Sequence, residues 1–315
     1  MSGPQQLLSA AHAVLREYPP PQTAELLESP IFIVSAPRAG SNLLFELLSN
    51  NKGAWSIGGE SHGIYRAFPH LRAENESLDS GSLGPRHADA TTRELLPACY
   101  VALMRDHRQV PFMARPPIER PSTVTLFEKT PRNALNIPFL LETFPDSRYI
   151  LLYRDPRGNI ASLLEAWRAG LRTGRFVTFR DLPGWDREAW CFLLPPGWRD
   201  MIGRSLAEIA AFQWRAANDA IIDALAALPD DRYVVLGYEE LIDDPNGAVQ
   251  RICDFADIEM TIRPARPLPL SRTSLTPPRP DKWRDHEATI EALRPQFEPV
   301  WQRLAGLRGA AADTG

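Results

Sequence analysis

The 315-residue sequence has few cysteines, little excess charge and no long apolar run. Its three cysteines show no paired spacing, which excludes a disulfide framework and a cysteine-based zinc site. The formal net charge of −4 gives no basic field that would favour nucleic acid as a partner. No apolar run reaches the roughly 18 residues of a membrane helix, and the first residues lack a signal-peptide pattern. These absences indicate a cytoplasmic protein with no membrane span.

The sequence does contain apolar strands that alternate with amphipathic helices. We expect strands at residues 31–35, 124–127, 148–153 and 232–236, and helices at residues 4–17, 40–50, 91–106, 133–143, 156–170, 203–228 and 285–306. This order predicts an α/β fold, a three-layer sandwich in which helices flank a central parallel sheet. Ligands of such sheets bind at the carboxyl ends of the strands. The loops that follow Ser35, Glu128, Arg154 and Gly237 should therefore converge on one site, within one domain that spans residues 1–315.

The first strand runs into an anion-binding type of loop, SAPRAGSN, at residues 35–42. Backbone amides at the start of the following helix, together with Arg38, suit phosphate or sulfate oxygens. The lysine of the usual phosphate-loop signature is absent. The alternative is a plain strand-to-helix turn in which Ser41 or Asn42 caps the helix.

A second candidate anion site follows the strand RYILLY at residues 148–153. Arg154 leaves the strand end, Asp155 and Pro156 open a helix, and Ser162 lies two turns into it. An arginine and a hydroxyl group on this edge of the sheet would suit a second phosphate. The alternative is a surface pair of Arg154 with Asp155 and a helix-interior serine.

Together, the two segments resemble the nucleotide site of sulfotransferases that use 3′-phosphoadenosine 5′-phosphosulfate (PAPS). In that family, a loop of the type [PK]-[RK]-[ST]-G-[ST]-[TN] holds the phosphosulfate, and R-[DN]-P with a later serine holds the 3′-phosphate. The matching residues here are Pro37 to Asn42, Arg154 to Pro156, and Ser162. Further likenesses are Glu128 to Pro131, Tyr238 to Leu241 with Pro245, and Ser271-Arg272 with Lys282-Trp283. The resemblance spans residues 30 to 285, with Ala39 and Asn42 departing from the commoner residues.

The resemblance implies a P-loop-type fold, PAPS as co-substrate and no required metal. It places Glu60, in GGESHG, as the catalytic base and makes Arg38 and Lys129 the cations that stabilise the transferred group. His62 is the rival base, and the other histidines show no ligand spacing. The expected nucleotide contacts are Arg38, Ala39, Gly40, Ser41, Asn42, Arg154, Ser162, Tyr238, Ser271, Arg272 and Lys282. A solvated loop carboxylate at Glu60 and a half-buried core tyrosine at Tyr238 are the alternatives.

Two segments are expected to cover the site. Residues 171–202 interleave aromatic residues with arginines and form an insertion, either packed on its own small core or covering an apolar acceptor. The Pro-rich segment 263–284 is expected to cover the nucleotide. We expect the acceptor to be a hydroxyl of a small apolar metabolite or of a carrier-bound acyl or polyketide chain. Arg172 and Arg175 would then dock an acyl carrier protein.

Two other functions fit parts of the pattern. A P-loop small-molecule kinase would use ATP and Mg²⁺, but it would normally carry the missing lysine. A non-catalytic nucleotide-binding module would not need Glu60 and Lys129. The sequence does not specify an oligomeric state.

Overall fold

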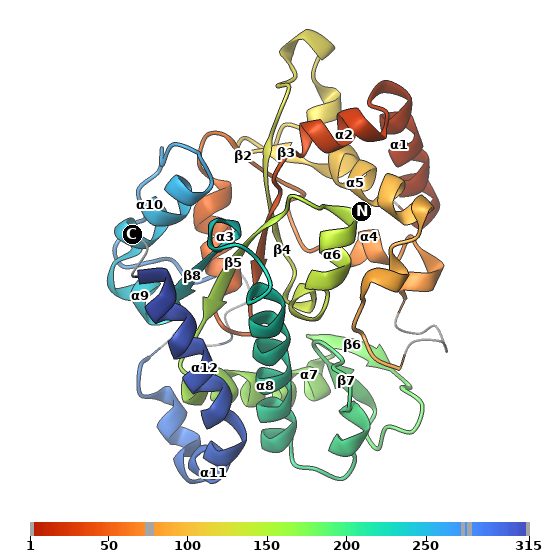
Figure 1. The fold of residues 1–315 in the computed structure, drawn as a ribbon. Helices are drawn as coiled ribbons and strands as arrows, with labels where there is room; N and C mark the ends of the chain where they lie inside the picture. Colours follow the sequence, from red (N-terminus) through yellow and green to blue (C-terminus); the bar gives the residue numbers. More distant parts are fainter. Residues whose placement is uncertain (1–2, 73–78, 272–274, 276–278, 313–315) are drawn as a thin grey trace.

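The computed structural model describes residues 3–72, 79–271, 275 and 279–312. Its centre is a six-stranded sheet in the order β3-β2-β4-β1-β5-β8 (Figure 1). The strands are β1 (Ile31–Val34), β2 (Ala54–Ser56), β3 (Arg105–Asp106), β4 (Thr125–Lys129), β5 (Arg148–Tyr153) and β8 (Tyr233–Gly237). All neighbours pair in parallel except β3, which pairs antiparallel with β2 at the edge.

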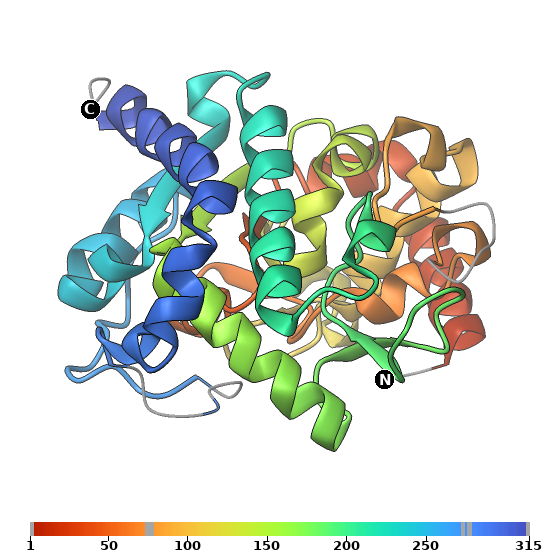
Figure 2. The same cartoon turned by 90° about the horizontal axis from the view of Figure 1, so that it is seen from below.

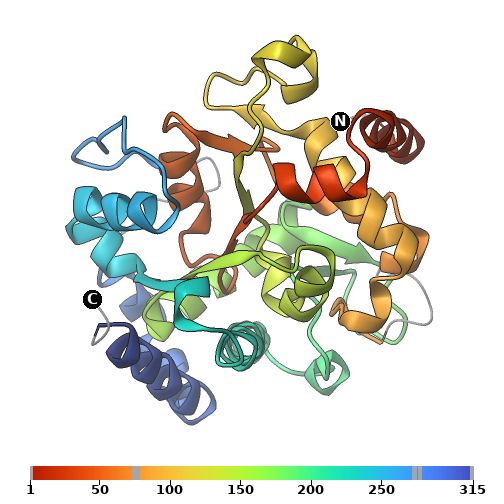
Figure 3. The same cartoon turned by 45° about the horizontal axis from the view of Figure 1, so that its top comes forward.

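Helices cover both faces of the sheet, as the alternation in the sequence predicts. Alternate residues of the central strand β1 point to opposite faces, so Ile31 and Ile33 join one apolar cluster and Phe32 and Val34 join the other. The first cluster is closed by α3 (Ser41–Ser49), α9 (Tyr238–Asp243) and α10 (Pro245–Phe255). The second is closed by α1 (Pro4–Glu17), α5 (Ala90–Leu103), α6 (Ile137–Thr143), α7 (Pro156–Thr173), α8 (Leu206–Leu225) and α12 (Arg294–Ala312). Figure 3 shows α3 and α10 on one side of the sheet and α1 and α5 on the other.

Several elements differ from the sequence prediction. The sequence predicts no element between residues 17 and 31, but α2 (Pro20–Leu26) begins at Pro20, where the first turn of a helix needs no amide donor. The helix expected at 285–306 is instead η8 (Lys282–His286), α11 (Glu287–Ala292) and α12, and Pro295, which has no amide to donate to the Glu291 carbonyl, lies in the first turn of α12. Two short elements, β2 and α4 (His62–Tyr65), lie in the segment 52–90, for which the sequence predicts neither a helix nor a strand.

The insertion has a small core of its own. It forms a hairpin of β6 (Val177–Arg180) and β7 (Ala189–Cys191), and its tryptophans pack with residues of α7 and α8. The indole of Trp167 donates to Gln213, whose amide donates to the carbonyls of Cys191 and Leu193, each at 2.8 Å. These bonds fix the hairpin against the two helices, which Figure 2 shows running beneath the sheet beside α12. Among the described helices, none is both long and apolar enough to cross a membrane.

Candidate active site

The loop between β1 and α3 has a backbone that only a narrow set of residues can adopt. Gly40 has φ of +107°, and a Cβ at this position would lie 2.4 Å from the ring of Tyr238. Arg38 also has a positive φ, of 68°. The Ala39 amide already donates to the Ala36 carbonyl at 3.3 Å, so this residue closes the turn. The turn leads into the first amides of α3, which have no partner within the helix.

Arg154 lies at the end of β5 and reaches the same loop. Its guanidinium stacks over the Tyr238 ring at 4.6 Å and donates to the Arg38 carbonyl at 3.4 Å. The alternative of an Arg154–Asp155 surface pair is wrong, because Asp155 binds Arg157 through two side-chain hydrogen bonds. Asn159 of α7 donates to the Pro37 carbonyl at 2.8 Å. The β1 and β5 loops are therefore held together by direct hydrogen bonds.

The loops meet at one cavity of about 710 Å³, as their positions at the strand ends predict. It is lined by these predicted residues: Arg38, Gly40, Ser41, Asn42, Glu60, His62, Arg154, Ser162, Tyr238, Ser271 and Lys282. Lys129 lies behind the wall and reaches it through Glu60. Arg272 lies outside the described residues. Among those described, no group of three His, Cys, Asp or Glu side chains is placed to hold a metal ion.

Glu60 contacts two of the three other residues that the sequence places in catalysis, Lys129 and His62. Lys129 pairs with Oε1 of Glu60, and Nε2 of His62 lies 2.9 Å from Oε2. Lys129 is 3% exposed and Glu60 is 34% exposed. Burial raises the pKa of Glu60, but the His62 hydrogen bond and the Lys129 charge outweigh it, and the pKa falls to about 2. Glu60 is therefore a carboxylate at neutral pH.

The cavity is electropositive around Arg38. Burial, together with the charges of Arg175 and Arg154, lowers the pKa of Arg38 to about 10. Its guanidinium lies 5.2 Å from the ring of Phe176 on the insertion. Because its surroundings disfavour the positive form of this guanidinium, an anion that binds beside it would stabilise the positive charge.

A buried polar network lies beneath the Glu60–Lys129 pair. Glu128, fully buried beside Lys129 in β4, accepts from Thr130 at 2.5 Å and from Asn133 at 2.7 Å. The amide of Ser61 donates to Thr130 at 2.8 Å. Ser61 and Thr130 directly follow Glu60 and Lys129, so this bond holds the two catalytic candidates together. Gly58, with φ of +73°, allows the turn that brings the Glu60 loop there.

The chain matches a known protein family over most of its length. Residues 30–261 match the model of the sulfotransferase family. The chain belongs to this family. No curated protein matches it. Solved structures that resemble this sulfotransferase include STF9 from Mycobacterium avium, which is 19% identical. The match covers 93% of this chain and 81% of that chain, with a TM-score of 0.50. A sulfotransferase from Alicyclobacillus acidocaldarius is 16% identical, and the match covers 89% of this chain and 95% of that chain with a TM-score of 0.47. The sulfotransferase domain of the curacin biosynthetic pathway is 22% identical, and the match covers 73% of this chain and 74% of that chain with a TM-score of 0.44. At these identities, the likeness concerns the fold.

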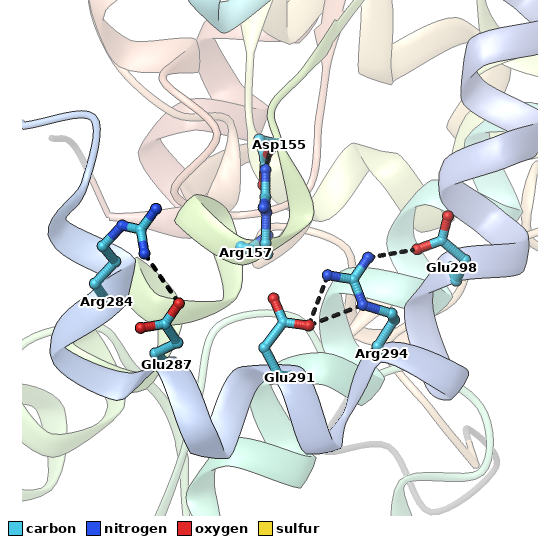
Figure 4. A network of polar contacts seen from close by, with 7 residues as sticks. All are labelled: Asp155, Arg157, Arg284, Glu287, Glu291, Arg294 and Glu298. Carbon is cyan, nitrogen blue, oxygen red and sulfur yellow. Dashed lines mark hydrogen bonds and ion pairs between the residues drawn. The ribbon is translucent and has the colours of Figure 1, made fainter.

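The C-terminal part of the sulfotransferase chain is tied to α7 beside the cavity. The guanidinium of Arg157 lies 4.7 Å from the Trp283 ring, and Lys282 pairs with Glu165 of α7. Figure 4 shows Asp155 and Arg157 above α11 and α12, where Arg284 binds Glu287 and Arg294 binds Glu291 and Glu298. Exposed ion pairs and exposed cation–π contacts each stabilise by about 1 kcal/mol or less, so the segment is held by several weak contacts together.

The cavity also contains residues that sequence reasoning missed. Arg66, Arg72 and Arg132 line it beside the Glu60 loop, and Glu165 lines it beside Lys282. No periodicity or motif marks the three arginines. Only the meeting of the β2 and β4 loops brings them to one wall.

A pH dependence of stability is expected from Glu128. Burial raises its pKa to about 7, although the hydrogen bonds from Thr130 and Ser61 act in the opposite sense. The folded state therefore holds a proton that the unfolded state has released, and stability falls as pH rises from about 4.5 to about 7. Glu128→Gln should remove this pH-dependent loss of stability, which is on the order of 3 kcal/mol in the free energy of unfolding between pH 4.5 and pH 7.

The measurement is urea unfolding of the wild type and Glu128→Gln at several pH values between 4.5 and 8. The difference between the two free energies of unfolding should change steadily in favour of the variant and level off above pH 7. A difference that stays constant with pH would show that Glu128 ionises normally.

Proposed function

We propose that this sulfotransferase moves the sulfuryl group of PAPS to a hydroxyl of an acceptor with an apolar body. One observation carries the proposal: two separate arginine-bearing anion loops, at residues 38–42 and 154–162, line a single cavity with the carboxylate Glu60. A phosphosulfate and a 3′-phosphate are two separated anionic groups on one nucleotide. A triphosphate needs one clamp and a metal ion.

The residues present fit such a nucleotide. Arg38, Ser41 and Asn42 would bind the phosphosulfate together with the first amides of α3. Arg154 and Ser162 would bind the 3′-phosphate. Tyr238 supports this site physically, since its ring packs on Gly40 and beneath Arg154. Ser271 and Lys282, from the segment 263–284 that we place over the nucleotide, would complete the wall.

The chemistry follows from the charges. The acceptor hydroxyl must lose a proton, and the oxygen that leaves with the phosphate gains negative charge. Glu60 would take the proton, oriented by His62 at 2.9 Å. Lys129 and Arg38 would stabilise the leaving oxygen. When Lys129 shifts its contact from Glu60 to that oxygen, Glu60 loses one of the charges that lower its pKa, and its basicity rises as the proton is needed.

The insertion 171–202 would cover the acceptor. Its Phe176, Phe179, Phe192 and Leu193 line the cavity with apolar surface. Delivery by an acidic carrier protein stays a prediction. It rests on Arg172 and Arg175, which are exposed at the C-terminal end of α7 and just after it, and a KM for carrier-bound substrate that is unchanged without them would contradict it.

Calorimetric titration with adenosine 3′,5′-bisphosphate (PAP) in EDTA, and with ATP and Mg²⁺, tests the nucleotide assignment. PAP should bind without metal and much more tightly than ATP. Arg154→Gln should weaken PAP binding roughly 10- to 100-fold, because it removes a charge-assisted phosphate contact.

Arg303→Gln is the matched control, since Arg303 pairs with Asp219 and Asp223 on α8 and does not line the described part of the cavity. It should bind PAP as the wild type does. Tight ATP–Mg²⁺ binding with no response to PAP would favour the kinase alternative. PAP binding without turnover of any acceptor would favour the non-catalytic alternative.

A further inference from the structure

The cavity has a second group of cations that the proposed nucleotide site does not use. Arg66 follows α4, Arg72 follows the 3₁₀ helix Pro69–Leu71, and Arg132 lies in the 3₁₀ helix Pro131–Leu135. All three line the cavity. Their segments follow β2 and β4. The proposed nucleotide residues follow β1, β5 and β8, on the other side in the sheet order. The three guanidiniums therefore lie on the acceptor side.

No carboxylate among the described residues of the cavity wall pairs with Arg66 or Arg72. The acidic side chains among the described lining residues are Glu60 and Glu165. Glu60 is bonded to Lys129 and His62, and Glu165 is paired with Lys282. Arg66 and Arg72 are exposed and make no ion pair with any described residue. The Arg72 side chain donates to the Arg66 carbonyl at 3.0 Å, so the two arginines are held next to each other.

Apolar side chains also line the cavity. Leu71 lines it next to Arg72, and Phe176 and Phe192 of the insertion stack at 5.2 Å with an interplanar angle of 23°, where the Arg38 guanidinium lies 5.2 Å from the Phe176 ring. The insertion is bonded to the segment that follows β2, where the Gly81 amide donates to the Leu194 carbonyl at 2.7 Å and the Trp198 indole donates to the Asp79 carbonyl at 2.9 Å. The acceptor space thus has apolar walls and a cationic end.

We propose that the acceptor is an amphiphile whose apolar body carries an oxyanion, a carboxylate or a phosphate, in addition to its hydroxyl. The oxyanion binds Arg66, Arg72 and Arg132, the apolar body lies along Leu71 and the hairpin, and the hydroxyl faces Glu60. Guanidinium groups match the planar, two-oxygen geometry of such anions. This proposal rests on the proposed function, because it takes the β1–β5–β8 side for the nucleotide.

Two probes of equal chain length test it, 10-hydroxydecanoate and 1,10-decanediol, which differ in one carboxylate. Each is titrated into the protein saturated with PAP, so that the acceptor side alone is open. The acid should bind at least about tenfold more tightly than the diol. In Arg66→Gln/Arg72→Gln and in Arg132→Gln, the affinity for the acid should fall toward that for the diol, and the affinity for the diol should not change. The same titrations with 10-hydroxydecyl phosphate show which oxyanion binds better.

The outcomes are separable. Equal affinity for acid and diol, no binding of the acid, or an acid preference that survives all three substitutions would overturn the proposal, and the arginines would then be solvated surface groups. PAP affinity is measured first and should be unchanged in each variant. A wild type that does not bind PAP would overturn the proposed function and this inference with it. Arg303→Gln serves as the control and should keep the full preference for the acid.

Discussion

Replacing Glu60 with glutamine is expected to lower kcat by roughly 10²- to 10⁴-fold, the usual contribution of a positioned general base. Glutamine keeps the shape of the side chain but cannot accept the proton of the acceptor hydroxyl. Because the anion loops are untouched, the Kd for PAP should change little. The measurement is kcat at saturating PAPS together with PAP calorimetry on the same preparation.

His62→Asn decides which residue is the base. If His62 only orients Glu60 through the 2.9 Å contact, this variant should lose less activity than Glu60→Gln. A larger loss in His62→Asn, with Glu60→Gln nearly active, would assign the base to His62. Glu94→Gln, at an exposed position of α5, should behave as the wild type.

The second large effect is expected at Lys129. Lys129→Met keeps a side chain of similar length in a site that is 3% exposed but removes the positive charge. We expect kcat to fall roughly 10²- to 10³-fold, as when one preorganised group that stabilises a developing negative charge is lost. The pKa of Glu60 should also rise, because the Lys129 charge is one of the causes that hold it at about 2.

Two comparisons sharpen this experiment. Lys129→Arg keeps the charge but not the fit, since a forked guanidinium is larger than an ammonium group, and it should recover only part of the activity. Lys52→Met, at an exposed lysine, should have no effect on kcat. A Lys129→Met enzyme with wild-type kcat would show that the lysine only supports the fold.

The two loops that we propose to bind anions could be predicted from the sequence because each is a local pattern. A buried strand, a short turn and a helix start lie within a dozen residues, so spacing alone predicts that Arg38, Ser41 and Asn42 share one loop. The same holds for Arg154 and Ser162, one following a strand and one on the next helix. The carboxyl-end rule for parallel strands then predicted that four loops would converge, and the cavity confirms it.

Other features depended on contacts between distant segments. Glu60 and Lys129 are 69 residues apart, and their pairing depends on β2 and β4 being neighbours, which no local pattern encodes. The two-residue strand β3 is too short to leave an alternation in the sequence, so its antiparallel pairing was not predicted. The cationic wall of Arg66, Arg72 and Arg132 also follows from the order of strands.

By itself, the sequence determined the fold class and the residue types at the anion loops. Periodicity and turn chemistry act over a few residues and are written directly in the chain. The tertiary structure alone decided the charge state of Glu60, the raised pKa of Glu128 and the cationic wall of the cavity. The physical reason is that desolvation and Coulomb interactions depend on distances between atoms, and those distances are set by packing between segments far apart in the sequence.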